Sequence, residues 1–183
     1  MEDISLHILD IAQNSVAAGA THIAIRITDN ASEDSFVLEI EDNGRGIPRD
    51  LLEKVLDPFF TSRTTRNVGL GLSLLAQSAR DTGGDISVES EEGAGTRVRA
   101  SFRPSHIDMK PLGNIDDTLL VLIAANPVID FFFSYEKPSE RYVLDTREIK
   151  AQLEEVPITS PYVLSLLKEE LRRSLGRIIP APE

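Results

Sequence analysis

The chain has 183 residues, of which 41% are hydrophobic, enough for a sizeable domain with a buried core. It has no cysteine, which excludes disulfides and thiolate-bound metals, and its 30 acidic and 19 basic side chains give a net charge of −11. Such a chain repels phosphate backbones unless it carries a basic patch, and the sequence shows none, so we expect no nucleic acid partner.

Helix and strand patterns alternate along the first hundred residues. Apolar residues at helical spacing predict helices at 4–18, about 48–56 and about 69–81. Period-two alternation predicts strands at 22–28, 36–41, 85–90 and 96–102, the last two forming a hairpin. This order predicts an α+β fold with helices layered on one face of a mixed β-sheet.

The second part of the chain predicts a small α+β appendage. We expect a nucleotide domain over 1–105, a linker over 106–113 and the appendage over 114–183. Within the appendage, the patterns predict a helix at 115–125 and strands at 128–135 and 141–144. Asp145 and Ser160 have the spacing of N-caps for two further helices, the second with proline at its first position.

Four short motifs carry the candidate chemistry. They are Asn14 within Asp10-Ile-Ala-Gln-Asn14-Ser-Val-Ala-Ala-Gly-Ala20, Asp42-Asn-Gly-Arg-Gly-Ile47, Asp57-Pro-Phe-Phe-Thr-Ser-Arg63 with Gly69-Leu-Gly-Leu-Ser73, and Gly93-Ala-Gly-Thr96. Each alone is typical of an ordinary turn or a solvent-facing polar residue. The phosphate-binding patterns of P-loop and Rossmann proteins are absent from the sequence.

In this order, over residues 10–102, the motifs resemble the nucleotide site of the GHKL superfamily (gyrase, heat-shock chaperone, histidine kinase, MutL). The Asp57–Arg63 and Gly69–Ser73 motifs resemble the F and G2 boxes of histidine kinases, whereas the Asn14 motif resembles MutL-type ATPases. The resemblance implies a Bergerat α/β sandwich that binds ATP and Mg²⁺.

The resemblance also implies roles for single residues. Asn14 would supply an amide oxygen to Mg²⁺, and Asp42 would accept a hydrogen bond from the adenine amine. The remaining nucleotide contacts would come from backbone close to the base, from a helix N-terminus facing the phosphates, and from a hydroxyl at the adenine end. These residues are Gly44, Gly46, Ile47, Gly69, Leu70, Gly71 and Thr96.

The polar segment from about Arg49 to Val68 would form an ATP lid, with Arg63 and Arg66 as γ-phosphate contacts. The chain departs from the family at two places. Histidine kinases usually carry Lys or Arg three residues after the metal-binding Asn, where this chain has Ala17. Hydrolytic members carry Glu four residues before that Asn, where this chain has Asp10, either a shorter catalytic base or an ordinary helix acid.

The sequence is compatible with three uses of ATP. The protein hydrolyses ATP or transfers its γ-phosphate to a partner protein, or it is a nucleotide-dependent regulator, or it is a non-catalytic sensor or assembly factor in which lid closure changes a surface. The helix that carries Asn14 begins close to Met1, so we expect no histidine-bearing dimerisation hairpin. None of His7, His22 and His106 lies in a kinase-like acceptor sequence.

Partners and location are also expectations. We expect a protein partner bound through the lid or the C-terminal region, and a homodimer is a further possibility. The acidic start lacks a signal-peptide pattern and the longest apolar stretch is too short to span a bilayer, so we expect a cytoplasmic protein with no membrane contact.

Overall fold

The computed structural model describes residues 3–52, 54–55 and 70–179. Its helices are α1 (Ile4–Ala17), α2 (Arg49–Leu52), α3 (Gly71–Asp81), α4 (Ile115–Ala125), α5 (Thr146–Leu153) and α6 (Pro161–Ile178). Its strands are β1 (His22–Asn30), β2 (Ser35–Asp42), β3 (Ile86–Glu91), β4 (Gly95–Phe102), β5 (Asp130–Lys137) and β6 (Glu140–Asp145).

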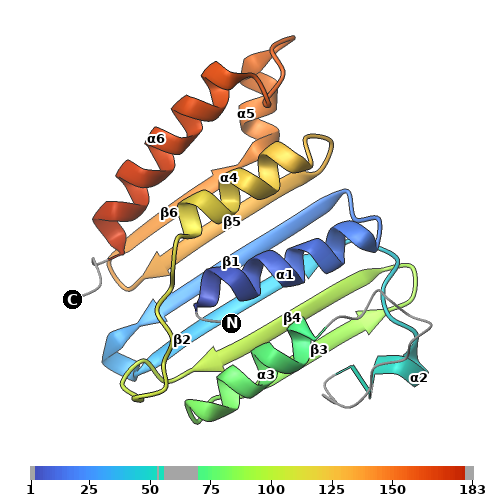
Figure 1. Ribbon diagram of the computed structural model, residues 1–183, viewed down its shortest axis with the longest axis vertical. Coiled ribbons are helices and arrows are strands. Elements are labelled where there is room, and N and C mark those ends of the chain that lie inside the picture. The colour runs from blue at the N-terminus through green and yellow to red at the C-terminus, as the bar shows by residue number, and fades with distance from the viewer. Residues whose placement is uncertain (1–2, 53, 56–69, 180–183) are drawn as a thin grey trace.

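The strands form one six-stranded sheet in the order β3-β4-β2-β1-β5-β6 (Figure 1). All neighbouring pairs are antiparallel except β1 and β5, which run parallel. A parallel pair needs a crossover, and the chain makes it through the segment after β4 and through α4. The sheet is therefore mixed, as the sequence predicts.

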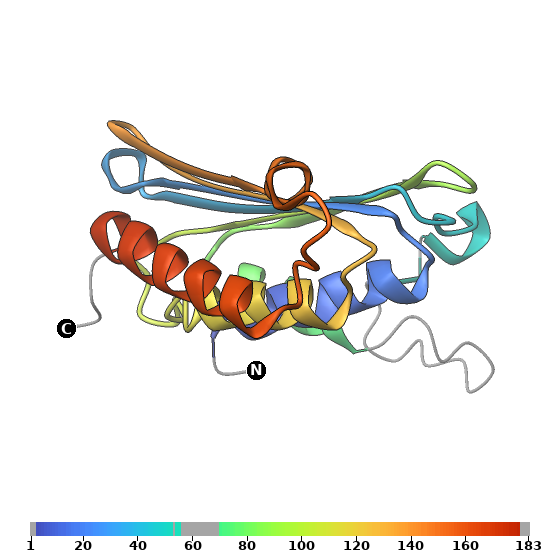
Figure 2. The same cartoon turned by 90° about the horizontal axis from the view of Figure 1, so that it is seen from above.

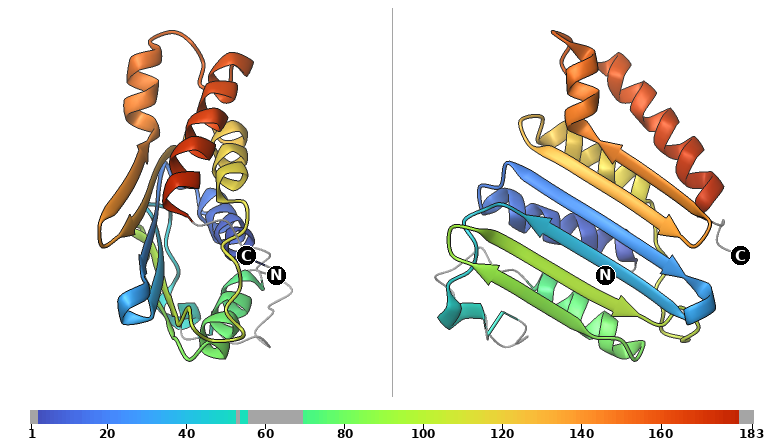
Figure 3. Two further views of the ribbon diagram at one scale, coloured as in Figure 1. Left: turned by 90° about the vertical axis from the view of Figure 1, so that its left-hand side faces the viewer. Right: turned by 180° about the vertical axis from the view of Figure 1, so that it is seen from behind.

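The long helices α1, α3, α4 and α6 lie on one face of the sheet (Figure 2). The opposite face carries no described helix, as the view from behind shows (Figure 3, right). Alternation along β1 explains this: Ile23, Ile25 and Ile27 are buried, whereas Arg26 on the other face is half-exposed. The predicted α+β fold, with helices on one face of a mixed sheet, is confirmed.

The open face is covered by a row of charges. Arg26 pairs with Glu39 at 3.2 Å and with Glu41 at 3.0 Å, and Arg97 pairs with Glu41 at 3.1 Å. Burial by itself raises the pKa of Glu41, but hydrogen bonds and charge from Arg26 and Arg97 outweigh it and hold that pKa below its usual value. These partly exposed pairs explain why the face can stay open to water.

The predicted elements are present with shifted ends. Gly19, with φ of +78°, follows α1 where we expected the helix to stop, and α3 begins at Gly71, two residues later than expected. The N-caps Asp145 and Ser160 are confirmed, because their side chains accept hydrogen bonds from the backbone N–H of Arg147 and of Val163.

The C-terminal elements share the sheet and core of the first hundred residues. Phe131, Phe133 and Tyr135 of β5 are buried in the same apolar cluster as the isoleucines of β1. The expected linker also contacts the body, since the first two N–H groups of α1 donate to the carbonyl groups of Pro111 and Leu112. The division of the chain into domains at 106–113 stays a prediction.

No helix within the described ranges is long and apolar enough to cross a membrane.

Candidate functional site

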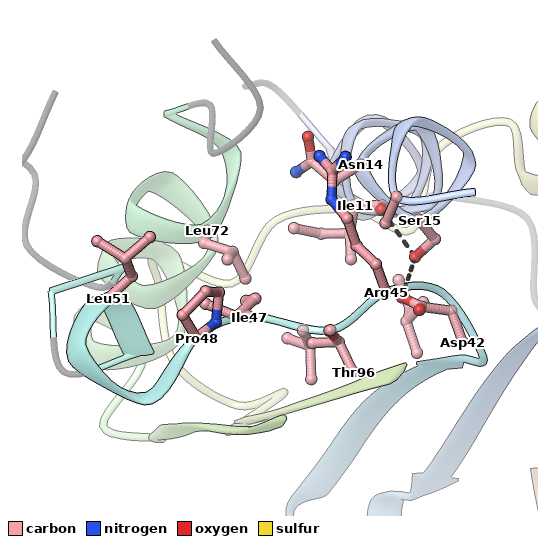
Figure 4. A pocket seen from close by; sticks show the side chains of 14 residues that line it. Ile11, Asn14, Ser15, Asp42, Arg45, Ile47, Pro48, Leu51, Leu72 and Thr96 are labelled. Carbon is pink, nitrogen blue, oxygen red and sulfur yellow. Dashed lines mark hydrogen bonds between the residues drawn. The ribbon is translucent and has the colours of Figure 1, made fainter. Parts of the chain in front are cut away.

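A pocket of about 260 Å³ opens between α1, α3 and the ends of β2 and β4 (Figure 4). Its floor is apolar, and its polar side chains come from α1, from the end of β2, from the loop after β2 and from the start of β4. The lining residues are Ile11, Asn14, Ser15, Ala18, Ile40, Asp42, Arg45, Gly46, Ile47, Pro48, Leu51, Leu72, Thr96 and Val98.

Asp42, the last residue of β2, has both carboxylate oxygens fixed. Its Oδ2 accepts a hydrogen bond from Ser15 Oγ at 2.5 Å, and its Oδ1 accepts one from the N–H of Gly44 at 2.8 Å. Directly opposite on β4 lies Thr96, because Asp42 and Thr96 are register partners. Two of the predicted nucleotide contacts therefore lie side by side at one end of the pocket.

Ser90 of β3 organises the backbone around Thr96. Its hydroxyl oxygen accepts a hydrogen bond from the N–H of Ile47 at 2.8 Å and lies 2.9 Å from Thr96 Oγ1. It also donates to the carbonyl group of Gly95 at 2.8 Å. One serine thus connects the loop after β2 to the β3–β4 hairpin, a role that no sequence pattern indicates.

Gly46 brings that loop close to the hairpin. It has a φ of +70°, and a Cβ atom there would lie 2.1 Å from the backbone oxygen of Glu91. A glycine is therefore required at this position both for its backbone conformation and for the contact with the neighbouring backbone.

Asn14 lies at the other end of the pocket from Asp42 and Thr96, and the side chain of Arg45 reaches toward it from the loop after β2. Both line it, and their side chains point toward one another in Figure 4. Neither side chain makes a hydrogen bond or ion pair with any residue in the described ranges. This end of the pocket therefore offers an amide and a guanidinium that are unpaired among those residues.

Asp10 lies one helical turn before Asn14 on α1 and contacts the start of α3. A Cβ atom added to Gly71 would lie 1.6 Å from Asp10 Oδ2, so the carboxylate packs directly against the glycine. Residues four apart share a helix face, which places Asp10 and Asn14 on the same side of α1. Gly71 thus leaves room for an acid beside the helix N-terminus.

The predicted site residues fall into three groups. Asn14, Asp42, Gly46, Ile47 and Thr96 line the pocket. The others in the described ranges, Asp10, Gly44, Leu70 and Gly71, lie outside its lining, with Leu70 as the N-cap of α3. Arg63, Arg66 and Gly69, and most of the predicted lid, lie outside the described residues.

Two polar residues of the lining, Ser15 and Arg45, were missed by the sequence analysis. Ser15 belongs to the apolar stripe of α1, and a serine there is compatible with simple packing. Arg45 lies inside the Asp42–Ile47 motif, but its position in the loop gives no indication of where its side chain points. Only the fold brings both into the pocket.

The sequence profile of the histidine kinase-, DNA gyrase B- and HSP90-like ATPases matches residues 2–106, more than half of the chain. The chain belongs to this ATPase family. The match covers every element around the pocket, and the fold with its helices on one face of a mixed sheet is the fold of the family.

Similar proteins are sensor kinases. The chain is 41% identical over 99 residues to the sensor kinase CckA of Brucella abortus, which covers 54% of this chain and 10% of that protein. It is also 32% identical over 89 residues to the sensor histidine kinase ZraS of Escherichia coli K12. That match covers 49% of this chain and 19% of ZraS. The chain thus spans only a tenth to a fifth of these relatives.

Solved structures share the fold of the ATPase domain. The MutL ATPase domain of Aquifex aeolicus, complexed with ADP, aligns over 100% of both chains with a TM-score of 0.51 and 14% identity. The N-terminal domain of a DNA repair protein aligns over 79% of this chain and 53% of that one, with a TM-score of 0.57 and 20% identity. These structures show the fold, and the family match over residues 2–106 supports ATP as the nucleotide.

Proposed function

We propose that the pocket binds Mg-ATP and that the protein hydrolyses it or transfers its γ-phosphate to a separate partner protein. The observation that carries this proposal is the shared pocket of Asp42, Thr96 and Asn14, which are the adenine and metal positions of the family motifs. The three residues come from β2, β4 and α1, so only the folded chain brings them together.

Adenine would lie at the Asp42 end. The carboxylate is held by Ser15 and Gly44, which leaves it acceptor capacity for the exocyclic amine of adenine. Guanine presents a carbonyl oxygen at that position, and two acceptors facing one another repel. The apolar side chains of Ile40, Ile47 and Val98 would contact the faces of the base.

Mg²⁺ would be held at the Asn14 end. Magnesium keeps several waters and takes only one or two protein oxygens together with phosphates. The Asn14 amide fits this demand, because it lines the pocket and has no hydrogen-bond partner among the described residues. When bound, the ion would neutralise phosphate charge, which an acidic protein cannot do by itself.

Asp10 would act as the base. In this proposal its carboxylate takes the proton of the attacking water or hydroxyl group, while a bond forms to the γ-phosphorus and the bridging oxygen leaves with ADP. Its position against Gly71, at the start of α3, supports this role because a helix N-terminus favours phosphate. Asp is one methylene shorter than Glu, so the reach of this carboxylate decides between turnover and simple binding.

The test is phosphate release from saturating Mg-ATP by the wild type, Asp10→Asn and the control Asp81→Asn at the far end of α3. Nucleotide-induced thermal shifts report occupancy in all three. Turnover that is lost only in Asp10→Asn, with occupancy kept, supports the ATPase with Asp10 as base. Occupancy without turnover in any variant contradicts hydrolysis and leaves either a kinase that needs its partner protein or the alternative, a non-catalytic regulator. Absence of occupancy contradicts the proposal.

A protein partner would dock through the lid or the C-terminal region. A groove of about 460 Å³ between β6, α5 and α6 supports docking at the C-terminal region. Val143, Tyr162 and Leu166 line it and are 44%, 73% and 48% exposed. The proposal also includes a cytoplasmic location and a possible homodimer.

A further inference from the structure

The pocket contains an unexplained cation. Histidine kinases usually carry Lys or Arg three residues after the metal-binding Asn, but this chain has Ala17 there. Among the residues found to line the pocket, Arg45 is the only basic one. ATP carries several negative charges and the protein has a net charge of −11. A phosphate site here therefore needs positively charged side chains in addition to Mg²⁺.

The backbone of Arg45 is fixed on both sides. Its N–H donates to the carbonyl group of Ala18 at 3.0 Å, and its carbonyl group accepts from the N–H of Gly93 at 2.8 Å. The first bond ties it to the C-terminal end of α1, one residue beyond Ala17. The side chain of Arg45 therefore starts close to the position from which the Lys or Arg of histidine kinases would project from the helix.

The guanidinium group of Arg45 has no protein partner in the described ranges. It makes no ion pair with Asp42, which lines the same pocket, or with Asp10 on α1. Instead the side chain points to the Asn14 end of the pocket (Figure 4). A guanidinium that lines a pocket without an internal counter-ion is available to an external anion.

We propose that Arg45 binds phosphate oxygens of the nucleotide and takes over the role of the cation missing at Ala17. The proposal rests on the proposed function, because the anion is the phosphate chain of the same ATP. The fork of N–H donors on arginine matches two phosphate oxygens at once. The charge thus comes from the loop after β2 instead of from α1.

The experiment compares adenosine, ADP and ATP on the wild type, Arg45→Gln and Arg45→Lys, by titration calorimetry with Mg²⁺. We expect Arg45→Gln to weaken ATP and ADP about 10- to 100-fold and to leave adenosine within about 2-fold, since it removes a charged hydrogen-bond donor. Arg45→Lys keeps the charge and should lose less. Arg80→Gln, on the exposed end of α3, is the matched control and should change nothing.

Salt gives a second readout. If Arg45 pairs with phosphate, raising the salt concentration weakens ATP binding more in the wild type than in Arg45→Gln. Equal weakening of adenosine and ATP by Arg45→Gln, or no weakening of either, would overturn the proposal for Arg45. A wild type that binds none of the three ligands would instead overturn the proposed function itself, so the two failures are distinguishable.

Discussion

The hydroxyl group of Ser15 donates a hydrogen bond to Asp42, with 2.5 Å between Oγ and Oδ2, and so connects α1 to the end of β2 at one side of the pocket. The serine is 3% exposed, and its hydroxyl also lies 3.4 Å from the carbonyl oxygen of Ile11. The carboxylate proposed to select adenine is therefore oriented by a side chain 27 positions earlier in the sequence.

Ser15→Ala tests this orientation. Loss of one hydrogen bond to a charged acceptor should weaken adenosine and ATP by a similar factor, about 10-fold, because both share the adenine. Titration calorimetry measures both ligands, and Ser78→Ala, a second buried serine on α3, is the control. An effect on ATP alone would place Ser15 at the phosphates and contradict its assignment to the adenine end.

Gly71→Ala tests the contact between Asp10 and α3. The new methyl group would meet Asp10 Oδ2 at 1.6 Å, and the carboxylate can rotate away, so we expect the free energy of unfolding to change by less than about 1 kcal/mol. If Asp10 is the base, phosphate release at saturating nucleotide should fall sharply, whereas a loss of nucleotide affinity would report the proposed phosphate contact of Gly71 itself. Unchanged turnover would show that Asp10 is not the catalytic base.

Gly46→Ala is the contrasting variant. Here the methyl group would meet a backbone oxygen at 2.1 Å in a residue with a φ of +70°, and neither can adjust cheaply. We expect a loss of about 1–3 kcal/mol in the free energy of unfolding, measured by urea titration. A neutral result would mean that the loop after β2 moves more freely than the hydrogen bond from Ile47 to Ser90 suggests.

His7 on α1 should make stability depend on pH. It is fully buried, and neither ring nitrogen has a hydrogen-bond partner among the described residues. Burial, followed by the charge of Lys110, lowers its pKa from 6.5 to about 4. Between these values only the unfolded chain takes up the proton. His7 should therefore remove about 2–3 kcal/mol of stability as the pH falls from 6.5 to 4.

The measurement for His7 is urea unfolding at pH 7, 5.5 and 4 for the wild type and His7→Leu. Leucine has a similar volume and no polar atom, so the variant should be as stable as the wild type at pH 7, or more stable. It should also lose less stability toward pH 4. Parallel pH profiles for the two proteins would show that His7 does not titrate in this way.

Phe133→Ala tests how the two parts of the chain are joined. Phe133 is fully buried in β5, paired with Ile25 of β1, so its truncation should cost about 3–5 kcal/mol. Because the sheet is continuous, we expect a single unfolding transition in which thermal stability and nucleotide binding are lost together. Two transitions, with nucleotide binding kept in the second, would support an independent nucleotide domain over 1–105.

The sequence by itself determined the elements and the motifs. Periodicity gives the buried face of each helix and strand, and α4 lies where the pattern predicts it, at Ile115–Ala125. Asp42, Gly46 and Thr96 belong to motifs whose spacing is local, so the place of Asp42 and Thr96 at strand ends and of Gly46 in the loop after β2 could be predicted. The α+β class followed from the order of these elements.

Only the tertiary structure decided which elements meet. The apolar run from Ile129 to Tyr135 predicts a buried strand, but nothing in its period says that β5 runs parallel to β1 and extends the same sheet. Likewise the sequence does not place Arg45 beside Asn14, or Asp10 against Gly71. Local patterns indicate which face of a helix or strand is buried. The pairing of strands instead depends on backbone and packing contacts between residues far apart in the chain.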